Sequence, residues 1–179
     1  MSDVATPEDE GTEQVVEAEP ERCYGQLVTR SRGQLVIHVA REELAEVVRG
    51  LRDDEKFNMC VDVTAVDYSA SAAPRELPQG IEPERFEIIV GLLSHADRHR
   101  LRIRTQVPES DPSVPSLFDV HPGTEALERE VYDMFGIRFD GHPDLTRILM
   151  PEDWIGHPLR KDYSIGKIPV QFKGVVNER

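Results

Sequence analysis

The chain has 179 residues, of which 39% are hydrophobic, so it can bury one hydrophobic core of moderate size but hardly two. Its 34 acidic residues outnumber 21 basic residues and give a formal net charge of −13, which repels phosphate backbones and anionic lipid headgroups. Composition therefore argues against nucleic-acid binding and against direct binding to lipid.

The distribution of apolar and charged residues along the chain predicts where in the cell the protein is located. No stretch approaches the roughly 20 consecutive apolar residues that span a bilayer, and the acidic N-terminus lacks the basic and apolar regions of a signal peptide. We therefore expect the chain to stay in the cytoplasm.

The first segment of the chain is strongly acidic. Residues 1–22 contain eight acidic residues, one basic residue and no aromatic residue. Such a segment has too little apolar surface to offset the entropy lost on ordering. We predict a disordered N-terminal tail over residues 1–22.

A strand and an amphipathic helix are predicted next. Alternating side chains over residues 34–39 indicate a strand. Residues 41–52 follow with apolar residues at helical spacing, which are Leu44, Val47, Val48 and Leu51.

Three further strand-like runs follow, over residues 59–68, 85–93 and 101–107. They are predicted to form an antiparallel meander, with a flexible connection over residues 69–83, rich in Ser, Ala, Pro and Gly. The expected fold class is α+β, a mixed or antiparallel sheet with helices packed on one side. In the first run, Met59, Val61 and Val63 are expected to share one face of the strand.

Four prolines over residues 108–122 predict a connector without regular strand pairing. A helix is then expected over Glu125–Phe135, with Thr124 as its N-terminal cap and Gly136 at its left-handed C-terminal cap. Residues 137–139 are a candidate for the last strand.

Residues 140–179 contain loop-forming residues and scattered apolar side chains without a core of their own. This composition predicts an extended, irregular tail that docks onto another protein, following an α+β domain over residues 23–139. The scattered apolar residues are Trp154, Leu159, Tyr163, Ile165, Ile168, Val170 and Phe172.

The two cysteines, Cys23 and Cys60, lack CxxC spacing and cannot supply the four thiolates that an iron–sulfur cluster normally needs. We interpret them as buried or half-buried free thiols. The sequence also lacks GxGxxG and GxxxxGK[ST] nucleotide-binding motifs.

The predicted helix and the segment after it carry a long family resemblance. This region resembles the C subunit of bacterial NADH-quinone oxidoreductase, the 30 kDa subunit family of respiratory complex I. Residues 62–68 and 85–87 echo the same family upstream, so the resemblance extends roughly over residues 60–172. The matching stretches are residues 128–137, Phe139, 141–145, 147–149, 151–154 and 156–163.

The chain departs from the family pattern at four positions. Members of the family often have tryptophans near the positions of His121 and Ala126. They also often have a basic residue at the position of Thr146 and a proline at the position of Ser164. These differences concern the packing at the start of the helix and the bend after Tyr163, and they leave the core of the pattern intact.

The resemblance implies a structural subunit of the peripheral arm, bound to the cytoplasmic side of the cell membrane through other subunits. It implies contacts chiefly with the D subunit and with neighbouring B and I subunits. No catalytic residue, cofactor or metal is expected on this chain, and FMN and iron–sulfur clusters are expected on partner subunits.

Charged and aromatic residues in the matching region are candidates for the partner interface. A solvated helix face, with a weak pair between Arg129 and Asp133, competes with an ion-pair network that locks the tail or a partner. In that network, Arg147 and Arg160 are the expected fork-shaped donors. The candidate residues are Glu128, Arg129, Glu130, Asp133, His142, Arg147, Trp154, His157, Arg160, Lys161, Asp162 and Tyr163.

Two alternatives remain open from the sequence. His142 and His157, with nearby Asp144, Asp153 and Asp162, are ligand types for a free-standing metal-dependent hydrolase, although they lie in a Pro-rich loop without the rigid frame of HExxH. The other alternative is the equivalent subunit of a related membrane-bound hydrogenase or dehydrogenase.

Overall fold

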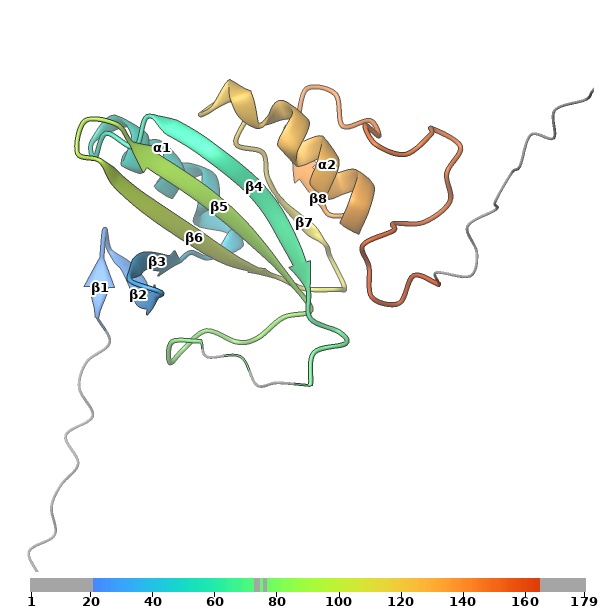
Figure 1. Cartoon of the computed structure of the whole chain (residues 1–179), viewed down its shortest axis with the longest axis horizontal. Coiled ribbons are helices and arrows are strands. Elements are labelled where there is room, and N and C mark those ends of the chain that lie inside the picture. The colour runs from blue at the N-terminus through green and yellow to red at the C-terminus, as the bar shows by residue number, and fades with distance from the viewer. Residues whose placement is uncertain (1–20, 73–74, 76, 165–179) are drawn as a thin grey trace, which may run out of the picture.

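The computed structural model describes residues 21–72, 75 and 77–164. Two helices and eight strands follow each other along this part of the chain (Figure 1). In order, they are β1 (Arg22–Cys23), β2 (Gln26–Ser31), β3 (Gln34–His38), α1 (Leu44–Asp53), β4 (Met59–Asp67), β5 (Phe86–Ser94), β6 (His99–Val107), β7 (Ser113–Pro115), α2 (Glu125–Phe135) and β8 (Arg138–Asp140).

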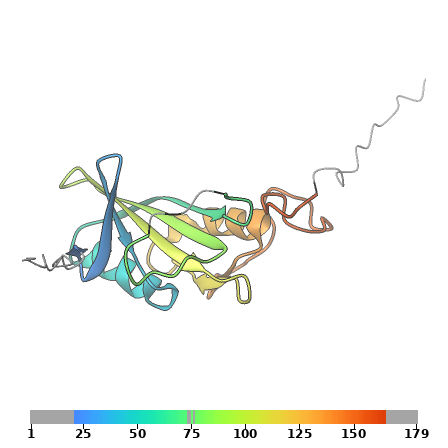
Figure 2. The same ribbon diagram turned by 90° about the horizontal axis from the view of Figure 1, so that it is seen from below.

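A six-stranded mixed sheet forms the body of the molecule, with strand order β1-β2-β3-β6-β5-β4. Strands β3 and β6 pair in parallel, and the other neighbours are antiparallel. The predicted meander is confirmed as β4, β5 and β6. Helices α1 and α2 pack on one side of the sheet, as Figures 1 and 2 show, so the predicted α+β class is also confirmed.

The core lies between the sheet and the two helices. Strand β5 alternates as expected, and its residues Phe86, Ile88, Val90 and Leu92 are completely buried on the helix side. Helix α1 contributes Leu44, Val48 and Leu51, and helix α2 contributes Val131, Met134 and Phe135 to the same cluster. One continuous apolar core therefore holds both helices against the sheet.

Strand β4 corrects the expected alternation at its start. A bulge between Cys60 and Asp62 shifts the register, so Cys60 pairs with the core residue Leu92 while Met59 and Val61 are exposed. The bulge fits against Gly91, where an added Cβ would lie 3.1 Å from Val61 Cγ2. The prediction that Met59 and Val61 share the buried face of Val63 was wrong.

The ends of the two helices differ in part from expectation. The predicted helix over residues 41–52 begins as a 3-10 turn, Arg41–Glu43, before α1. Helix α2 has the predicted bounds, and Gly136 adopts the left-handed conformation with φ of 74°. Thr124 occupies the N-cap position without a capping bond, because its hydroxyl donates to Glu128 Oε1 instead.

The proline-rich connector contains regular pairing that the sequence did not predict. Its segment β7 pairs in parallel with β8, the last strand, in a separate two-stranded sheet. Pro115 is tolerated because it lies at the end of this short edge.

Parts of two predictions fall outside the described residues. Of the predicted acidic tail over residues 1–22, only Glu21 and Arg22 lie within the described residues, and Arg22 begins β1. The C-terminal tail residues Ile165, Ile168, Val170 and Phe172 also lie outside the described residues. Among the described helices, neither is long and apolar enough to cross a membrane.

Candidate partner interface

Asp133 on α2 is the central attachment point for the segment that follows β8. Its carboxylate is completely buried and accepts a hydrogen bond from Arg147 Nη1 at 2.5 Å. Its second oxygen accepts the backbone N–H groups of Ile148, Leu149 and Met150 at 2.8–3.1 Å. Burial alone would raise the pKa of Asp133, but these donors hold it below its ordinary value.

Arginine side chains extend this attachment along the loop. Arg147 also donates to the carbonyl of Gly156, and Arg129 donates to the carbonyls of Thr146 and Arg147 and to the Thr146 hydroxyl. Thr146 therefore serves as an acceptor for Arg129. The expected pair between Arg129 and Asp133 gives way to bonds from each residue to the loop.

The C-terminal end of α2 is satisfied by the same segment. The last carbonyls of a helix have no partner within it. Here the ring nitrogen Nδ1 of His157 bonds the carbonyl of Asp133 at 3.0 Å, Leu159 N–H donates to Met134, and Arg160 Nε donates to Phe135 at 2.6 Å. Residues 157–160 thus cap the helix.

Gly136 permits this cap. The His157 ring lies so close that a Cβ at Gly136 would meet its Nε2 at 2.5 Å. A left-handed backbone and a close approach therefore both require glycine at this position.

A second buried carboxylate ties the segment to the sheet. Asp67, at the end of β4, accepts Arg85 Nη2 at 3.0 Å and the backbone N–H of Lys161 at 2.9 Å. Arg85 also pairs with Asp162 and Glu109. Burial alone would raise the pKa of Asp67, but Arg85 and the backbone donors hold it far below its ordinary value.

Glu128 lies inside the domain rather than on a solvated helix face. It is completely buried and accepts bonds from the Leu117 N–H and from the hydroxyls of Ser116 and Thr124. The interpretation of Glu128 and Asp133 as a solvated face was therefore wrong. Glu130, by contrast, is exposed.

The two histidines of the hydrolase alternative lie at opposite ends of α2. His142 Nε2 contacts the carbonyl of Glu125, and His157 Nδ1 contacts that of Asp133. These carbonyls are eight residues apart, roughly 12 Å along a helix. The structure does not bring His142 and His157 together at one ion, and a shared metal site is not supported.

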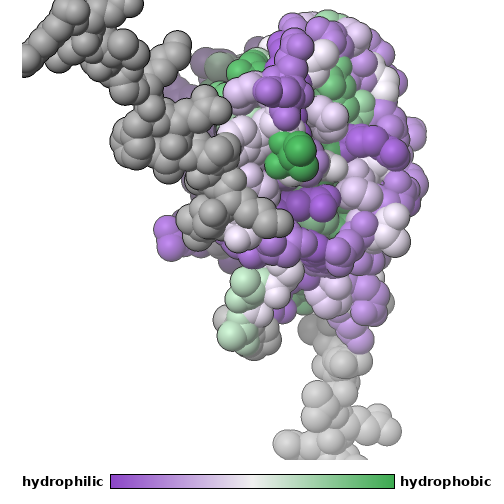
Figure 3. Space-filling model, turned by 90° about the vertical axis from the view of Figure 1, so that its right-hand side faces the viewer, coloured by the Kyte–Doolittle hydropathy of each residue, from purple (hydrophilic) through white to green (hydrophobic). Residues whose placement is uncertain are grey.

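Large hydrophobic side chains are exposed on the attached segment. Ile155 is 89% exposed and Leu149 59%, and Ile148 and Leu159 are also exposed. Figure 3 shows this side of the molecule, where hydrophobic patches interrupt a mostly hydrophilic surface. Trp154 is half-buried, and its indole N–H has no acceptor within the described part of the chain. Exposed apolar side chains gathered on one segment are typical of a protein-binding surface.

The sequence had assigned no role to Asp67 or Arg85. Both belong to the short upstream stretches that match the family pattern, and that match was the only signal available. Their contact with residues 161–162 spans more than 75 positions and depends on the tertiary fold.

Solved structures share this fold. The trypsin-resistant fragment (1–134) of Nqo5 superposes with a TM-score of 0.59 at 35% identity, covering 68% of this chain and 90% of that one. A chain of the membrane-bound sulfane sulfur reductase, an archaeal respiratory membrane complex, superposes with a TM-score of 0.58 at 22% identity, covering 86% and 90%. The second likeness concerns the fold alone.

Sequence relatives define the family. A profile described as the respiratory-chain NADH dehydrogenase 30 Kd subunit matches residues 37–168. The C subunit of NADH-quinone oxidoreductase from Saccharopolyspora erythraea is 47% identical over 82% of this chain and 56% of its own length, and that from Nocardia farcinica is 50% identical over 80% and 53%. The chain belongs to the family of the respiratory-chain NADH dehydrogenase 30 Kd subunit. It spans about half the length of these curated relatives.

Proposed function

We propose that this chain is a non-redox structural subunit of the peripheral arm of a proton-translocating NADH-quinone oxidoreductase. The observation that carries the proposal is the family match over residues 37–168, together with relatives that bear the name of the C subunit of that enzyme. In this role the chain supports electron transfer from NADH to quinone by holding other subunits in position.

The electron carriers, FMN and iron–sulfur clusters, belong in this proposal to partner subunits. The positions of the two cysteines support that division. Cys23 lies on β1 and Cys60 on β4, at opposite edges of the six-stranded sheet, so their thiols cannot serve one cluster together. The chain's own contribution is then positional, without catalytic residues.

The D subunit is the chief proposed partner, with the B and I subunits as neighbours. The surface proposed for it consists of residues 141–164 and the exposed Glu130 of α2. Its exposed apolar residues supply buried area, and Trp154 and Tyr163, both half-buried, add aromatic surface. His142, Lys161 and Asp162 supply polar contacts at its margin.

Internal bonds give this surface a defined shape before a partner binds. Arg129, Arg147, His157 and Arg160 all bond the segment to α2. A preorganised surface loses less conformational entropy on binding than a free tail would. In this proposal, the complex then holds the chain on the cytoplasmic side of the cell membrane.

Affinity purification of the tagged chain from membranes, followed by mass spectrometry, tests the proposal. We expect flavin-binding and cluster-binding subunits of NADH-quinone oxidoreductase to co-purify in stoichiometric amounts. Recovery with hydrogenase subunits would instead indicate the related enzyme. Recovery of the chain alone, with stoichiometric zinc or iron, would contradict a structural role.

A further inference from the structure

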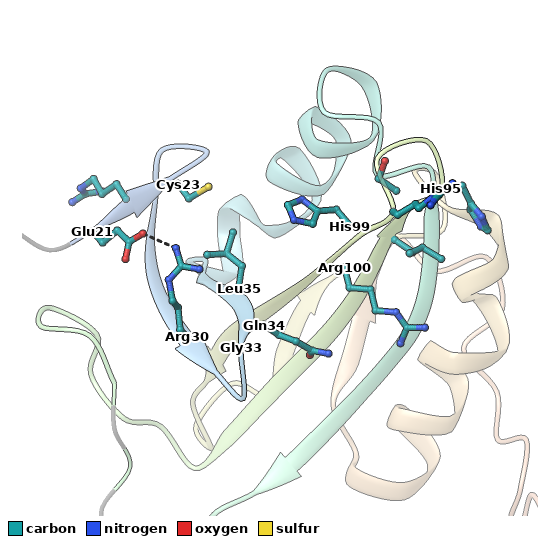
Figure 4. Close-up of a pocket in the computed structure, with 13 residues that line it drawn as sticks. Glu21, Cys23, Arg30, Gly33, Gln34, Leu35, His95, His99 and Arg100 are labelled. Carbon is teal, nitrogen blue, oxygen red and sulfur yellow. Dashed lines mark hydrogen bonds and ion pairs between the residues drawn. The ribbon is translucent and has the colours of Figure 1, made fainter.

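A hollow of about 640 Å³ lies at one end of the main sheet, away from residues 141–164. Strands β3 and β6 run parallel, so the turns that precede them lie at the same end of the sheet. These turns, together with β1, line the hollow, as Figure 4 shows. Two parts of the chain that are distant in sequence, residues 21–35 and 93–100, thus meet there.

Basic side chains line this hollow in a protein that is acidic as a whole. Among the described residues that line it, Glu21 is the only acidic one. The basic residues are Arg22, Arg30, Arg98, Arg100, His95 and His99.

The four arginines among them have few internal partners. Glu21 pairs with Arg30 at 3.1 Å, and Arg22 donates to the carbonyl of Gly25. Within the described residues, Arg98 and Arg100 have no acceptor. Two arginines are therefore free to bind a ligand in the hollow.

We propose that this hollow binds a multivalent oxyanion, with Arg98 and Arg100 as its main donors. A guanidinium group matches the geometry of phosphate and carboxylate oxygens and forms charge-assisted hydrogen bonds with them. The acidic remainder of the molecule does not prevent this, because charges are screened beyond about 8 to 10 Å at physiological salt. A small oxyanion therefore senses mainly the local arginines.

Two sources can supply such an oxyanion. One is a free phosphate-bearing molecule. The other is the chain's own acidic segment, which leads directly into Glu21 and contains seven further carboxylates, those of Asp3, Glu8, Asp9, Glu10, Glu13, Glu17 and Glu19. In both cases, oxyanion oxygens accept hydrogen bonds from the arginines. In the second case, the covalent link to Glu21 raises the local concentration of the carboxylates at the hollow.

Calorimetric titration of the full chain with inorganic pyrophosphate at physiological salt is the first test. We expect saturable binding that weakens about tenfold or more when Arg98→Gln and Arg100→Gln are combined. Arg49→Gln removes an exposed arginine of α1, outside the hollow, and should leave the affinity unchanged.

A variant with the seven N-terminal carboxylates changed to amides distinguishes the two sources. Equal affinity in this variant and the wild type indicates a free oxyanion. Tighter binding in the variant, or binding in it alone, indicates that the chain's own carboxylates occupy the hollow. Absence of binding in both proteins overturns the proposal.

Cys23, which also lines the hollow, provides an independent readout. Burial raises the pKa of the Cys60 thiol to about 11, so alkylation near pH 8 reports mainly on Cys23. Arginines in the hollow should favour iodoacetate over neutral iodoacetamide, and the double arginine variant should lower that rate ratio several-fold. A ratio unchanged in the double variant contradicts the proposal, and the Arg49 variant is the control.

Discussion

At the scale of single residues, Asp133 is the group whose loss should matter most for stability. Its buried carboxylate accepts hydrogen bonds from four donors in residues 147–150. Within the described chain, no other carboxylate accepts bonds from these four donors. We expect Asp133→Asn to lower the free energy of unfolding by about 3 kcal/mol, because Arg147 is left half-buried without its counter-charge. Urea unfolding of the isolated chain measures this.

Glu130→Gln is the matched control, because Glu130 is an exposed carboxylate on the same helix. Its unfolding free energy should stay within about 0.5 kcal/mol of the wild type. Equal stability of the Asp133 and Glu130 variants would show that the buried network contributes little.

His157 predicts a pH dependence with a definite sign. Burial, and then Arg160 and Arg147 nearby, lower its pKa below the ordinary value. The folded state therefore binds the proton less tightly than the unfolded state, whose histidine pKa is about 6.5. The stability that His157 contributes is full above that pH and is lost as the pH falls through the lower folded pKa.

Unfolding of the wild type and of His157→Gln, compared between pH 7.5 and pH 5, tests this sign. The stability difference in favour of the wild type should shrink as the pH falls. The comparison is differential because Glu128, whose pKa burial raises, contributes in the opposite sense in both proteins. A difference that grows toward acid pH would contradict the assignment.

At the scale of elements, the junction between α2 and the cap formed by residues 157–160 depends on Gly136. Gly136→Ala should lower the unfolding free energy by about 2 kcal/mol or more, since a left-handed alanine costs about 1–2 kcal/mol and its Cβ also displaces the His157 ring. Thermal or urea unfolding measures the change.

Gly123→Ala provides the control for that substitution. An added Cβ there meets nothing within 4 Å. Its stability should be close to that of the wild type or slightly higher. A Gly136 variant as stable as the Gly123 variant would mean that His157 does not pack as described.

At the scale of the whole molecule, stability and assembly should depend on different parts of the chain. The buried core determines the free energy of unfolding, whereas the exposed apolar surface of residues 141–164 is proposed to determine assembly. Ile155 is 89% exposed, so Ile155→Asp should leave the unfolding free energy within about 0.5 kcal/mol of the wild type. Assembly should suffer, because a charge is placed where the proposal requires burial against a partner. Native gels of membranes, scored for the intact complex, measure assembly.

Met59→Asp is the comparison, since Met59 is an exposed apolar residue on β4 outside this segment. It should assemble normally. Normal assembly of the Ile155 variant would remove Ile155 from the proposed interface.

Most of the helices and strands followed from local sequence pattern, but β1, β2 and β7 lie outside the predicted strands. Short stretches encode the alternation in β5 and β6 and the helical spacing of Leu44, Val48 and Leu51. The glycine after α2 is likewise a local signal, which marks the end of the helix. The bulge at Cys60–Asp62 and the pairing of β7 with β8 did not follow, because each depends on what a distant strand presents.

The α+β class, the bounds of α2 and the membership of the family could all be read from the linear chain, since periodicity and an ordered run of family residues are properties of sequence. Only the tertiary structure revealed that Asp133 and Glu128 are buried and that His142 and His157 lie apart. It also revealed the bonds from Asp67 and Arg85 to residues 161–162. A charged residue looks the same in sequence whether water or a buried donor satisfies it, because its partners are set by contacts between segments distant along the chain.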